Sequence, residues 1–413
     1  MRRNVAPRAS IEPERVAAIV LSWHSLEVVS LKKLQTLWAG YGYIYELTAR
    51  TAGDDDEKKA ELLPLILKFI APPQTRLDSG DEGHLRKLMS YEVEQYFYSS
   101  VAPLLEDEAA VARCVDTSRE AGEKPGAELL GGVTATIMTD LRPLFPVAGE
   151  KRSELNAKQI FAALDWLSSF HRISRKLVPD TLEEFLLPPL EEAERRRRVD
   201  SPGTKLWLNG GYTYLATRRK EYSSLVVDGD SEWSSVLTVP TTSSGQSISE
   251  MVADFLTPRG REYETLIHGD VKSENLFTTL SGDKVAFYDF QYVGLGLGVC
   301  DLAKLFTCSV PLSLLINDRG DILNELSMDE GEKKLLEYYY SKLVSDFRDS
   351  QGRKQKYDWD VFVRHWETAL VDWLRFQASW GFWGNTQWLE ARVRSILKNQ
   401  QWRDWLQENL GST

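Results

Sequence analysis

The stretch from Leu266 to Asp301 constrains this chain more than any other part of its 413 residues. It reads L-I-H-G-D-V-K-S-E-N-L-F-T-T-L-S-G-D-K-V-A-F-Y-D-F-Q-Y-V-G-L-G-L-G-V-C-D. Asp270 follows an apolar opening, Asn275 comes five residues later, and a second hydrophobic run, Val285 to Tyr288, leads to Asp289. The pattern predicts that these three oxygen-bearing side chains converge on one site.

Such a site suits phosphoryl transfer, where the protein's task is positioning and charge neutralisation. Mg²⁺ prefers carboxylate, amide and phosphate oxygens, so Asp289 and Asn275 are the expected metal ligands. Asp270 is expected to orient an acceptor hydroxyl and take its proton, and Lys272 is placed to reach the transferred phosphoryl group. The structural alternative is a surface hairpin with incidental acids.

Three motifs in this stretch occur together. They are H-G-D-x-x-x-x-N from His268 to Asn275, the strand-borne D-F at Asp289, and G-x-G-x-x-D-L-A from Gly296 to Ala303. The set resembles the aminoglycoside phosphotransferase and choline kinase-like (CHK kinase-like) family, which shares its fold with protein kinases. The resemblance implies an α+β, bilobal protein-kinase-like fold with a small antiparallel-sheet N-lobe and a larger, mainly helical C-lobe. It also implies that Asp301 is structural and bonds to backbone near the catalytic loop.

Two earlier segments match the nucleotide-binding side of this resemblance. Gly40 and Gly42 lie among aromatic and β-branched residues, which predicts two strands joined by a tight turn. The resemblance makes this the nucleotide-covering loop, although the full G-x-G-x-x-G of protein kinases is missing. Lys68 is the single charge in the strand-like run Leu62 to Ile70, and burying it unpaired would be costly. The resemblance implies that Lys68 holds the α and β phosphates of ATP, with a lysine snorkelling at a strand edge as the alternative.

The expected partner of Lys68 is Glu94. The segment Tyr91 to Tyr98 has helical spacing, and the resemblance favours Glu94 because a Phe-Tyr pair follows it three and four residues later. Glu92 is the competing choice.

A further strand is predicted from Thr134 to Met138, followed by prolines at positions 143 and 146. The resemblance places the adenine-binding hinge here, with Met138 and Asp140 as contact residues. We therefore expect an N-lobe over residues 1–140, a hinge over 141–148 and a C-lobe over 149–413.

Two parts of the expected C-lobe precede the catalytic stretch. Residues Gln159 to Arg175 form an amphipathic pattern with His171 on the apolar stripe, so we expect a satisfied core histidine and not a catalytic one. Residues 178–262 match the family poorly and form an insert that we expect to shape the acceptor site. Within it, Glu191 to Arg198 is interpreted as a solvated helix face, with a basic docking patch as the alternative.

Tryptophans recur near the C-terminal end, where a helix is expected. Those spaced by seven residues are Trp359, Trp366, Trp373 and Trp380. On a helix they form one slowly drifting stripe, and a core seam is the plain interpretation. The sharper hypothesis is that Trp380 and Trp383 wall the acceptor pocket, where an indole face can hold an ammonium group. Asp372, Arg375 and His365 are the nearby polar candidates.

Composition limits the partners and the compartment. A net charge of -11 argues against a nucleic-acid or anionic-membrane partner, whereas it is compatible with a cationic acceptor. The three cysteines lack the spacing of a disulfide framework or a zinc site. We find no secretory signal and no apolar run long enough to span a membrane, so a cytoplasmic protein is expected.

Together these features predict an ATP- and Mg²⁺-dependent kinase that phosphorylates a hydroxyl of a small acceptor. A protein kinase is the first alternative, but Asp289-Phe290-Gln291 stands where D-F-G would be, and no A-P-E segment follows. A nucleotide-binding pseudokinase acting as an interaction module is the alternative from another class, yet no expected catalytic residue is lost. The acceptor stays open among aminoalcohols, aminoglycosides, sterols and other alcohols.

Overall fold

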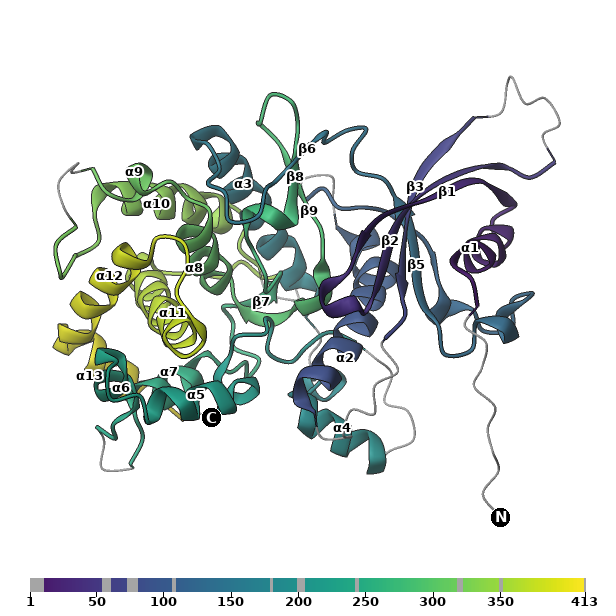
Figure 1. Ribbon diagram of the computed structural model, residues 1–413. Helices are drawn as coiled ribbons and strands as arrows, with labels where there is room; N and C mark the ends of the chain where they lie inside the picture. The colour runs from purple at the N-terminus through teal and green to yellow at the C-terminus, as the bar shows by residue number, and fades with distance from the viewer. Residues whose placement is uncertain are drawn as a thin grey trace, which may run out of the picture. The chain divides into compact units, whose positions relative to one another are not determined.

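The structure is a computed structural model that describes residues 11–53, 61–72, 81–105, 109–178, 181–198, 205–241, 245–317, 322–348 and 352–411. The chain forms two compact units. The first comprises Met1–Ser79, Tyr98–Pro103 and Ala112–Leu141, and the second comprises Gly80–Phe97, Leu104–Val111 and Arg142–Thr413. The fold is α+β, with an antiparallel sheet in the first unit and a mainly helical second unit (Figure 1), as predicted.

The first unit is built on a five-stranded antiparallel sheet in the order β1-β2-β3-β5-β4. The elements are α1 (Pro13–Ser22), β1 (Leu26–Thr36), β2 (Gly42–Thr51), β3 (Leu63–Ile70), β4 (Cys114–Thr117) and β5 (Thr134–Thr139). Helix α1 buries its apolar side, including Val16, Val20 and Leu21, in one core with the strands (Figure 1). Apolar residues at helical spacing on α1 and alternating ones on the strands therefore meet in one layer.

The strand before the glycine pair differs from the prediction. Leu37–Gly40 do not continue a strand, because Trp38–Gly40 form a short 3-10 turn and the strand itself is β1, Leu26–Thr36. Most of β1 is exposed at the sheet edge, and its charged residues Lys32 and Lys33 face solvent. An edge strand of this kind lacks the hydrophobic pattern on which strand prediction depends.

The second unit holds two small sheets and a set of helices. The strands are β6 (Val147–Ala148), β7 (Glu264–Ile267), β8 (Leu276–Thr278), β9 (Val285–Phe287) and β10 (Gly294–Leu297), paired as β10-β7 and β6-β8-β9. The helices before β7 are α2 (Glu82–Tyr96), α3 (Ala157–Ser174), α4 (Pro189–Arg198), α5 (Arg219–Val226), α6 (Glu232–Thr238) and α7 (Ile248–Leu256). Those after β10 are α8 (Val299–Cys308), α9 (Leu312–Leu315), α10 (Glu330–Val344), α11 (Trp359–Trp380), α12 (Thr386–Lys398) and α13 (Gln400–Glu408). Within the described ranges, every helix is too short or too polar to cross a bilayer.

Helix α2, which we expected in the N-lobe, packs in the second unit. Arg86 donates to the carbonyl of Thr217 at 2.7 Å, and Glu92 pairs with Arg196 of α4 at 2.9 Å. These partners come from the insert, residues 178–262, where no sequence pattern predicts a contact with this helix. Helix α4 is therefore not a plain solvated face, and its Glu192 is fully buried.

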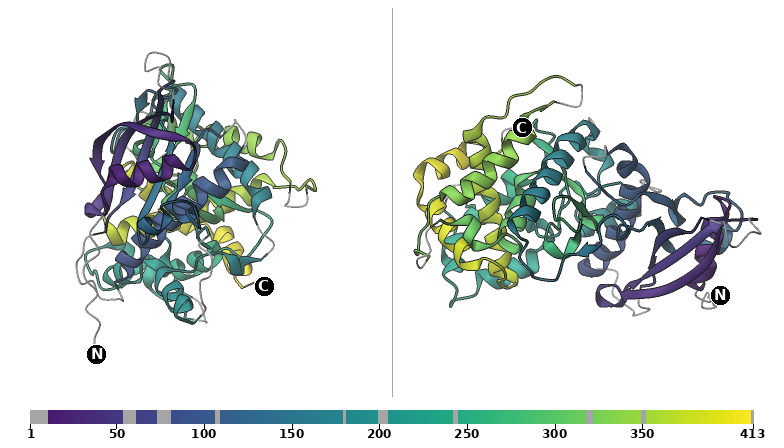
Figure 2. Two further views of the ribbon diagram at one scale, coloured as in Figure 1. Left: turned by 90° about the vertical axis from the view of Figure 1, so that its right-hand side faces the viewer. Right: turned by 90° about the horizontal axis from the view of Figure 1, so that it is seen from above.

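Helix α11 lies among the C-terminal helices, which are drawn in yellow-green and yellow in Figures 1 and 2. It contacts α5, α7, α8 and α12. Trp366 is fully buried and donates from Nε1 to Glu332 at 2.8 Å, and Trp373 is also buried. Trp380, in contrast, is 56% exposed because the helix ends there and Gly381 turns the chain. The core seam is confirmed for Trp366 and Trp373 and is wrong for Trp380.

Candidate active site

A buried carboxylate fixes the start of the catalytic loop. Asp301 on α8 accepts the backbone N–H of His268 at Oδ2 over 2.7 Å and that of Gly269 at Oδ1 over 2.9 Å. Burial opposes ionisation of Asp301, but the hydrogen bond and charge of His171, together with the charges of Lys304 and His268, outweigh it and lower the pKa of Asp301. His171 in turn contacts Tyr339 Oη at 2.8 Å. The structural roles predicted for Asp301 and His171 are confirmed.

His268 connects the loop to the strand that carries Asp289. Its Nε2 donates to the carbonyl of Tyr288 at 3.0 Å, and its Nδ1 accepts the backbone N–H of Asp270 at 3.3 Å. Burial lowers the pKa of His268, which favours the neutral ring. A neutral ring has one nitrogen that donates and one that accepts, as these two contacts require. The histidine acts as a structural link between the two expected catalytic segments.

Asp270, Lys272 and Asn275 form one hydrogen-bonded group. Asn275 Nδ2 donates to Asp270 Oδ2 at 2.9 Å and to the Asp270 carbonyl at 2.8 Å. Lys272 Nζ lies 3.1 Å from Asp270 Oδ2 and 3.0 Å from Glu274 Oε1. Burial works against the charge on Lys272, yet the two carboxylates raise its pKa. Because both amide hydrogens of Asn275 are used on Asp270, its amide oxygen is directed to the other side.

Asp289 sits in a left-handed backbone conformation, φ 66° and ψ 58°, which is uncommon for a residue with a side chain. Gln291 donates from Nε2 to Asp289 Oδ1 at 2.6 Å, and Ser90 of α2 donates to Gln291 Oε1 at 3.1 Å. Burial raises the pKa of Tyr292 to about 12, and the charges of both Asp270 and Asp289 add to the rise. The backbone N–H of Tyr288, the residue before Asp289, donates to the carbonyl of Asn275 at 3.0 Å, so the two expected metal ligands come from neighbouring backbone segments.

The donor set fits a hard cation. Mg²⁺ is commonly held by one or two carboxylates together with substrate phosphates, and Asp289 with the Asn275 amide oxygen supplies oxygen donors only. The described residues contain no cluster of three or more His, Cys, Asp or Glu side chains arranged to hold a metal alone. A metal at Asp289 and Asn275 would thus need phosphate or water oxygens to complete its shell.

Three of the six expected nucleotide-binding residues, Gly42, Lys68 and Met138, lie on the sheet of the first unit. Lys68 is buried on β3, between β2 and β5, so the alternative of a lysine at a strand edge is wrong. A side chain at Gly42 would come within 2.2 Å of the Phe69 carbonyl oxygen, which explains why glycine is needed there. Met138 is buried on β5, and the backbone N–H of Asp140 donates to Pro64 at 3.1 Å.

The pairing of Lys68 stays a prediction, as do the nucleotide contacts of Gly40, Met138 and Asp140. Glu94 is buried on α2. Glu92 is half-buried and engaged with Arg196, so it has a partner of its own within the second unit.

The insert runs along the catalytic segment, a contact that the sequence did not predict. Trp207 exchanges backbone hydrogen bonds with Val293 and Leu295, at 3.2 and 3.0 Å. Gly211 then donates to the Tyr292 carbonyl at 2.9 Å. A side chain at Gly269 would lie 2.6 Å from the Gly211 nitrogen. Glycine in H-G-D is therefore required by the neighbouring backbone of the insert.

Three further site residues come from the insert and from the segment after D-F. The rings of Tyr212 and Tyr292 are 4.8 Å apart, and burial together with the charge of Asp270 raises the pKa of Tyr212. The Arg218 guanidinium lies 5.4 Å from the Tyr212 ring and 4.9 Å from the Trp380 ring. The aromatic face expected to take a substrate ammonium thus carries a cation of the protein itself.

Trp383 lies closer to the catalytic loop than its distance in sequence indicates. It is half-buried, with its ring edge-on to Trp373 at 5.6 Å. Burial raises the pKa of Cys308 to about 12, a hydrogen bond with Trp383 opposes the rise, and the charge of Asp270 adds to it. Trp383 therefore lies beside Cys308, and the next residue, Ser309, accepts the backbone N–H of Ser273 in the loop at 2.8 Å.

Two of the polar candidates on α11, Arg375 and Asp372, form an ion pair with each other. Arg375 is fully buried and donates from Nη2 to Asp372 Oδ1 at 2.7 Å and to the Thr213 carbonyl at 2.6 Å. Asp372 is thereby balanced by a buried cation. His365 is buried in an aromatic cluster, and its Nδ1 contacts Tyr357 Oη at 2.5 Å.

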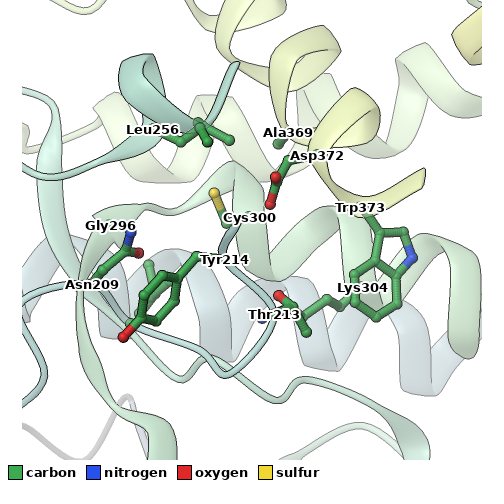
Figure 3. A pocket seen from close by; sticks show the side chains of 13 residues that line it. Asn209, Thr213, Tyr214, Leu256, Gly296, Cys300, Lys304, Ala369, Asp372 and Trp373 are labelled. Carbon is green, nitrogen blue, oxygen red and sulfur yellow. The ribbon is translucent and has the colours of Figure 1, made fainter. Parts of the chain in front are cut away.

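A pocket of roughly 500 Å³, open solvent included, lies beside this group. Its lining includes Asn209, Tyr214, Cys300, Lys304, Asp372 and Trp373 (Figure 3). The insert, α8 and α11 each contribute to it. Lys304 directly follows the D-L-A motif, and a lysine within the otherwise apolar run after Asp301 was a signal that sequence reasoning missed.

Three solved structures that align with most of this chain have low sequence identity to it. A macrolide 2′-phosphotransferase of Brachybacterium faecium is 11% identical, with 96% of this chain and 98% of that chain covered and a TM-score of 0.41. A choline kinase of Streptococcus pneumoniae is 12% identical, with 96% and 99% covered and a TM-score of 0.36. An ethanolamine kinase of Plasmodium vivax is 13% identical, with 92% and 84% covered and a TM-score of 0.36. No curated protein matches the sequence.

The sequence itself gives the assignment. A family model, described as the ecdysteroid kinase-like family, matches residues 41–351. The match spans most of the chain and includes Lys68, the loop from His268 to Asn275, and Asp289. The chain therefore belongs to the ecdysteroid kinase-like family.

Proposed function

We propose that this chain is an ATP- and Mg²⁺-dependent kinase that transfers the γ-phosphoryl group to a hydroxyl of a small acceptor. The observation that carries the proposal is the hydrogen-bonded group of Asp270, Asn275 and Lys272, whose Asn275 carbonyl accepts the backbone N–H of the residue before Asp289. A general base and an oxygen-rich metal site next to each other are what phosphoryl transfer to an alcohol requires.

In the proposed reaction, Asp270 accepts the proton of the acceptor hydroxyl while the oxygen attacks the γ-phosphorus. The bond between that phosphorus and the bridging oxygen breaks, and ADP leaves with the electron pair. Lys272, held between Asp270 and Glu274, is close enough to Asp270 to balance its charge and meet the transferred group. Mg²⁺, held by Asp289 and the Asn275 oxygen, would neutralise phosphate charge when bound.

Lys68, Gly40, Gly42, Met138 and Asp140 are proposed to hold the nucleotide, and Glu94 is proposed to hold Lys68. The burial of Lys68 supports this assignment, because a buried ammonium requires anionic or polar partners.

For the acceptor, we favour an uncharged alcohol over a cationic one. The two features that would have recognised an ammonium group are already in contact with arginine: Arg218 lies over Trp380, and Arg375 pairs with Asp372. The name of the family points to a steroid alcohol of the ecdysteroid type. Aminoalcohols and aminoglycosides are the alternatives, and the net charge of -11 gives no support to a nucleic-acid or anionic-membrane partner.

The test is ADP release from ATP across a panel of acceptors: an ecdysteroid, a simple sterol, choline, ethanolamine and an aminoglycoside. We expect Mg²⁺-dependent turnover with a hydroxylated acceptor, abolished in Asp270→Ala. Turnover that persists in Asp270→Ala, or ADP release that no acceptor stimulates, contradicts the proposal.

A further inference from the structure

Lys304 is a charged residue in an otherwise apolar part of the interior. It lies on α8 among buried apolar residues and is only 5% exposed. A buried ammonium is retained at a cost unless it is hydrogen-bonded. Its Nζ donates to the carbonyl oxygen of Gly269 at 2.5 Å, which is the residue immediately before the proposed base.

The peptide group that joins Gly269 to Asp270 is therefore held at both polar atoms. Lys304 bonds its oxygen, and the ring of His268 accepts its N–H at 3.3 Å. The preceding N–H, that of Gly269, is taken by Asp301. Asp301 and Lys304 are three residues apart on α8 and so share one face of the helix. A single turn of helix thus holds the backbone on both sides of the Gly269 α-carbon.

The ammonium has little freedom to move. The rings of Tyr212 and Trp373 lie with their centres 6.0 Å from Nζ. A side chain at Gly211 would come within 3.0 Å of it. Residues of the insert and of α11 therefore pack around the ammonium group of Lys304, next to the loop that carries Asp270.

We propose that Lys304 is a positioning residue for Asp270, and this inference rests on the proposed function. It fixes the rotation of the peptide that precedes Asp270 and thereby the direction of the carboxylate. The competing role is purely structural: Lys304 could serve only as a counter-ion that lets Asp301 stay ionised in the interior. The two roles make different predictions for amide exchange in the loop of a variant whose core remains folded.

The experiment compares Lys304→Met, which keeps the length of the chain and removes the donor, with Lys304→Arg and with Lys333→Met. Lys333 lies on α10 with a side chain that is 40% exposed, so it controls for loss of a lysine as such. We measure kcat, the KM for ATP, the melting temperature, and amide exchange of the segment from Leu266 to Lys272.

For Lys304→Met we expect kcat to fall by about 10- to 100-fold, because small misplacements of a reacting group are costly. The KM for ATP should change less than about twofold, and exchange should rise in the loop before it rises elsewhere. Lys304→Arg should recover part of kcat, and Lys333→Met should behave as wild type.

An unchanged kcat with unchanged loop exchange overturns the inference. So does a uniform rise in exchange with a lower melting temperature and a proportionate loss of all activity, since a counter-ion role alone gives that result. If the wild type phosphorylates no acceptor, the proposed function fails, and loop exchange still decides whether Lys304 holds the peptide.

Discussion

Asn275 Nδ2 lies 2.9 Å from Asp270 Oδ2, so the proposed metal ligand and the proposed base share a hydrogen bond. The same amide also bonds the backbone carbonyl of Asp270. A substitution at Asn275 should therefore affect both the metal and the orientation of the base. The two functions can be separated only by changing Asp270 or Asp289.

Asp270→Asn should leave nucleotide affinity almost intact and lower kcat by about 10²- to 10⁴-fold, the usual contribution of a general base. The asparagine keeps the shape of the side chain but cannot accept the acceptor's proton. Nucleotide affinity is measured by calorimetry and kcat by ADP release. Unchanged turnover would remove Asp270 from the reaction.

Asp289→Ala should abolish Mg²⁺-dependent nucleotide binding, whereas Asn275→Ala should weaken it. Asp289 brings a full charge to the ion and Asn275 only a dipole. Asp283→Ala is the matched control, because Asp283 lies exposed between β8 and β9 and bonds only to neighbouring hydroxyls among the described residues. Equal Mg·ATP affinity for wild type and Asp289→Ala in calorimetry would show that the metal lies elsewhere.

Trp383→Ala should raise the KM of the acceptor and leave that of ATP unchanged, because Trp383 is half-buried beside Cys308, whose neighbour Ser309 bonds to Ser273 of the loop. Trp366→Ala is the core comparison and should destabilise the protein by about 3–5 kcal/mol. Thermal melts and both Michaelis constants are recorded for each variant. If Trp383→Ala melts as low as Trp366→Ala and loses all activity in proportion, Trp383 belongs to the core.

His365→Gln should reduce the loss of stability on acidification. Burial lowers the pKa of His365 from 6.5 to about 3, so between these values the unfolded chain binds a proton that the folded chain excludes. Wild-type stability must then fall as the pH is lowered through 6.5. This one group accounts for about 2 kcal/mol between pH 7 and pH 5.

Glutamine at position 365 does not titrate and keeps an acceptor for Tyr357. Urea unfolding at both pH values measures the difference between the variant and the wild type. Identical pH dependence in the two proteins would mean that the pKa of His365 is the same in the folded and the unfolded chain.

Sequence reasoning succeeded where the signal was local. The turn from His268 to Asn275 and helix α3 have their own spacing and capping, so their existence could be predicted. The structure shows Asp270 and Asn275 joined directly, while the nucleotide and metal roles of the site residues stay predictions.

Sequence reasoning failed where contacts join segments that are distant in the chain. Tyr212 and Arg218 belong to an insert without a recognisable motif, and the position of Tyr212 beside Tyr292 follows from backbone pairing of the insert with β10. Strand β1 was missed because an exposed edge strand has no apolar alternation. The seven-residue tryptophan period continued into Trp380 in sequence, although the helix ends there and leaves that ring exposed.

The contact between Gly211 and Gly269, where an added side chain would meet backbone at 2.6 Å, sets a rule for exchanging parts between members of the family. The insert is not a detachable accessory that could be grafted alone to transfer acceptor preference. A chimera must carry the Gly210-Gly211 pair together with a recipient loop that also has glycine before its aspartate. A recipient with H-R-D in place of H-G-D would force the two backbones apart and displace the base, whereas a larger residue at position 211 would press on the Lys304 ammonium, 3.0 Å from the added carbon, in a backbone conformation that favours glycine.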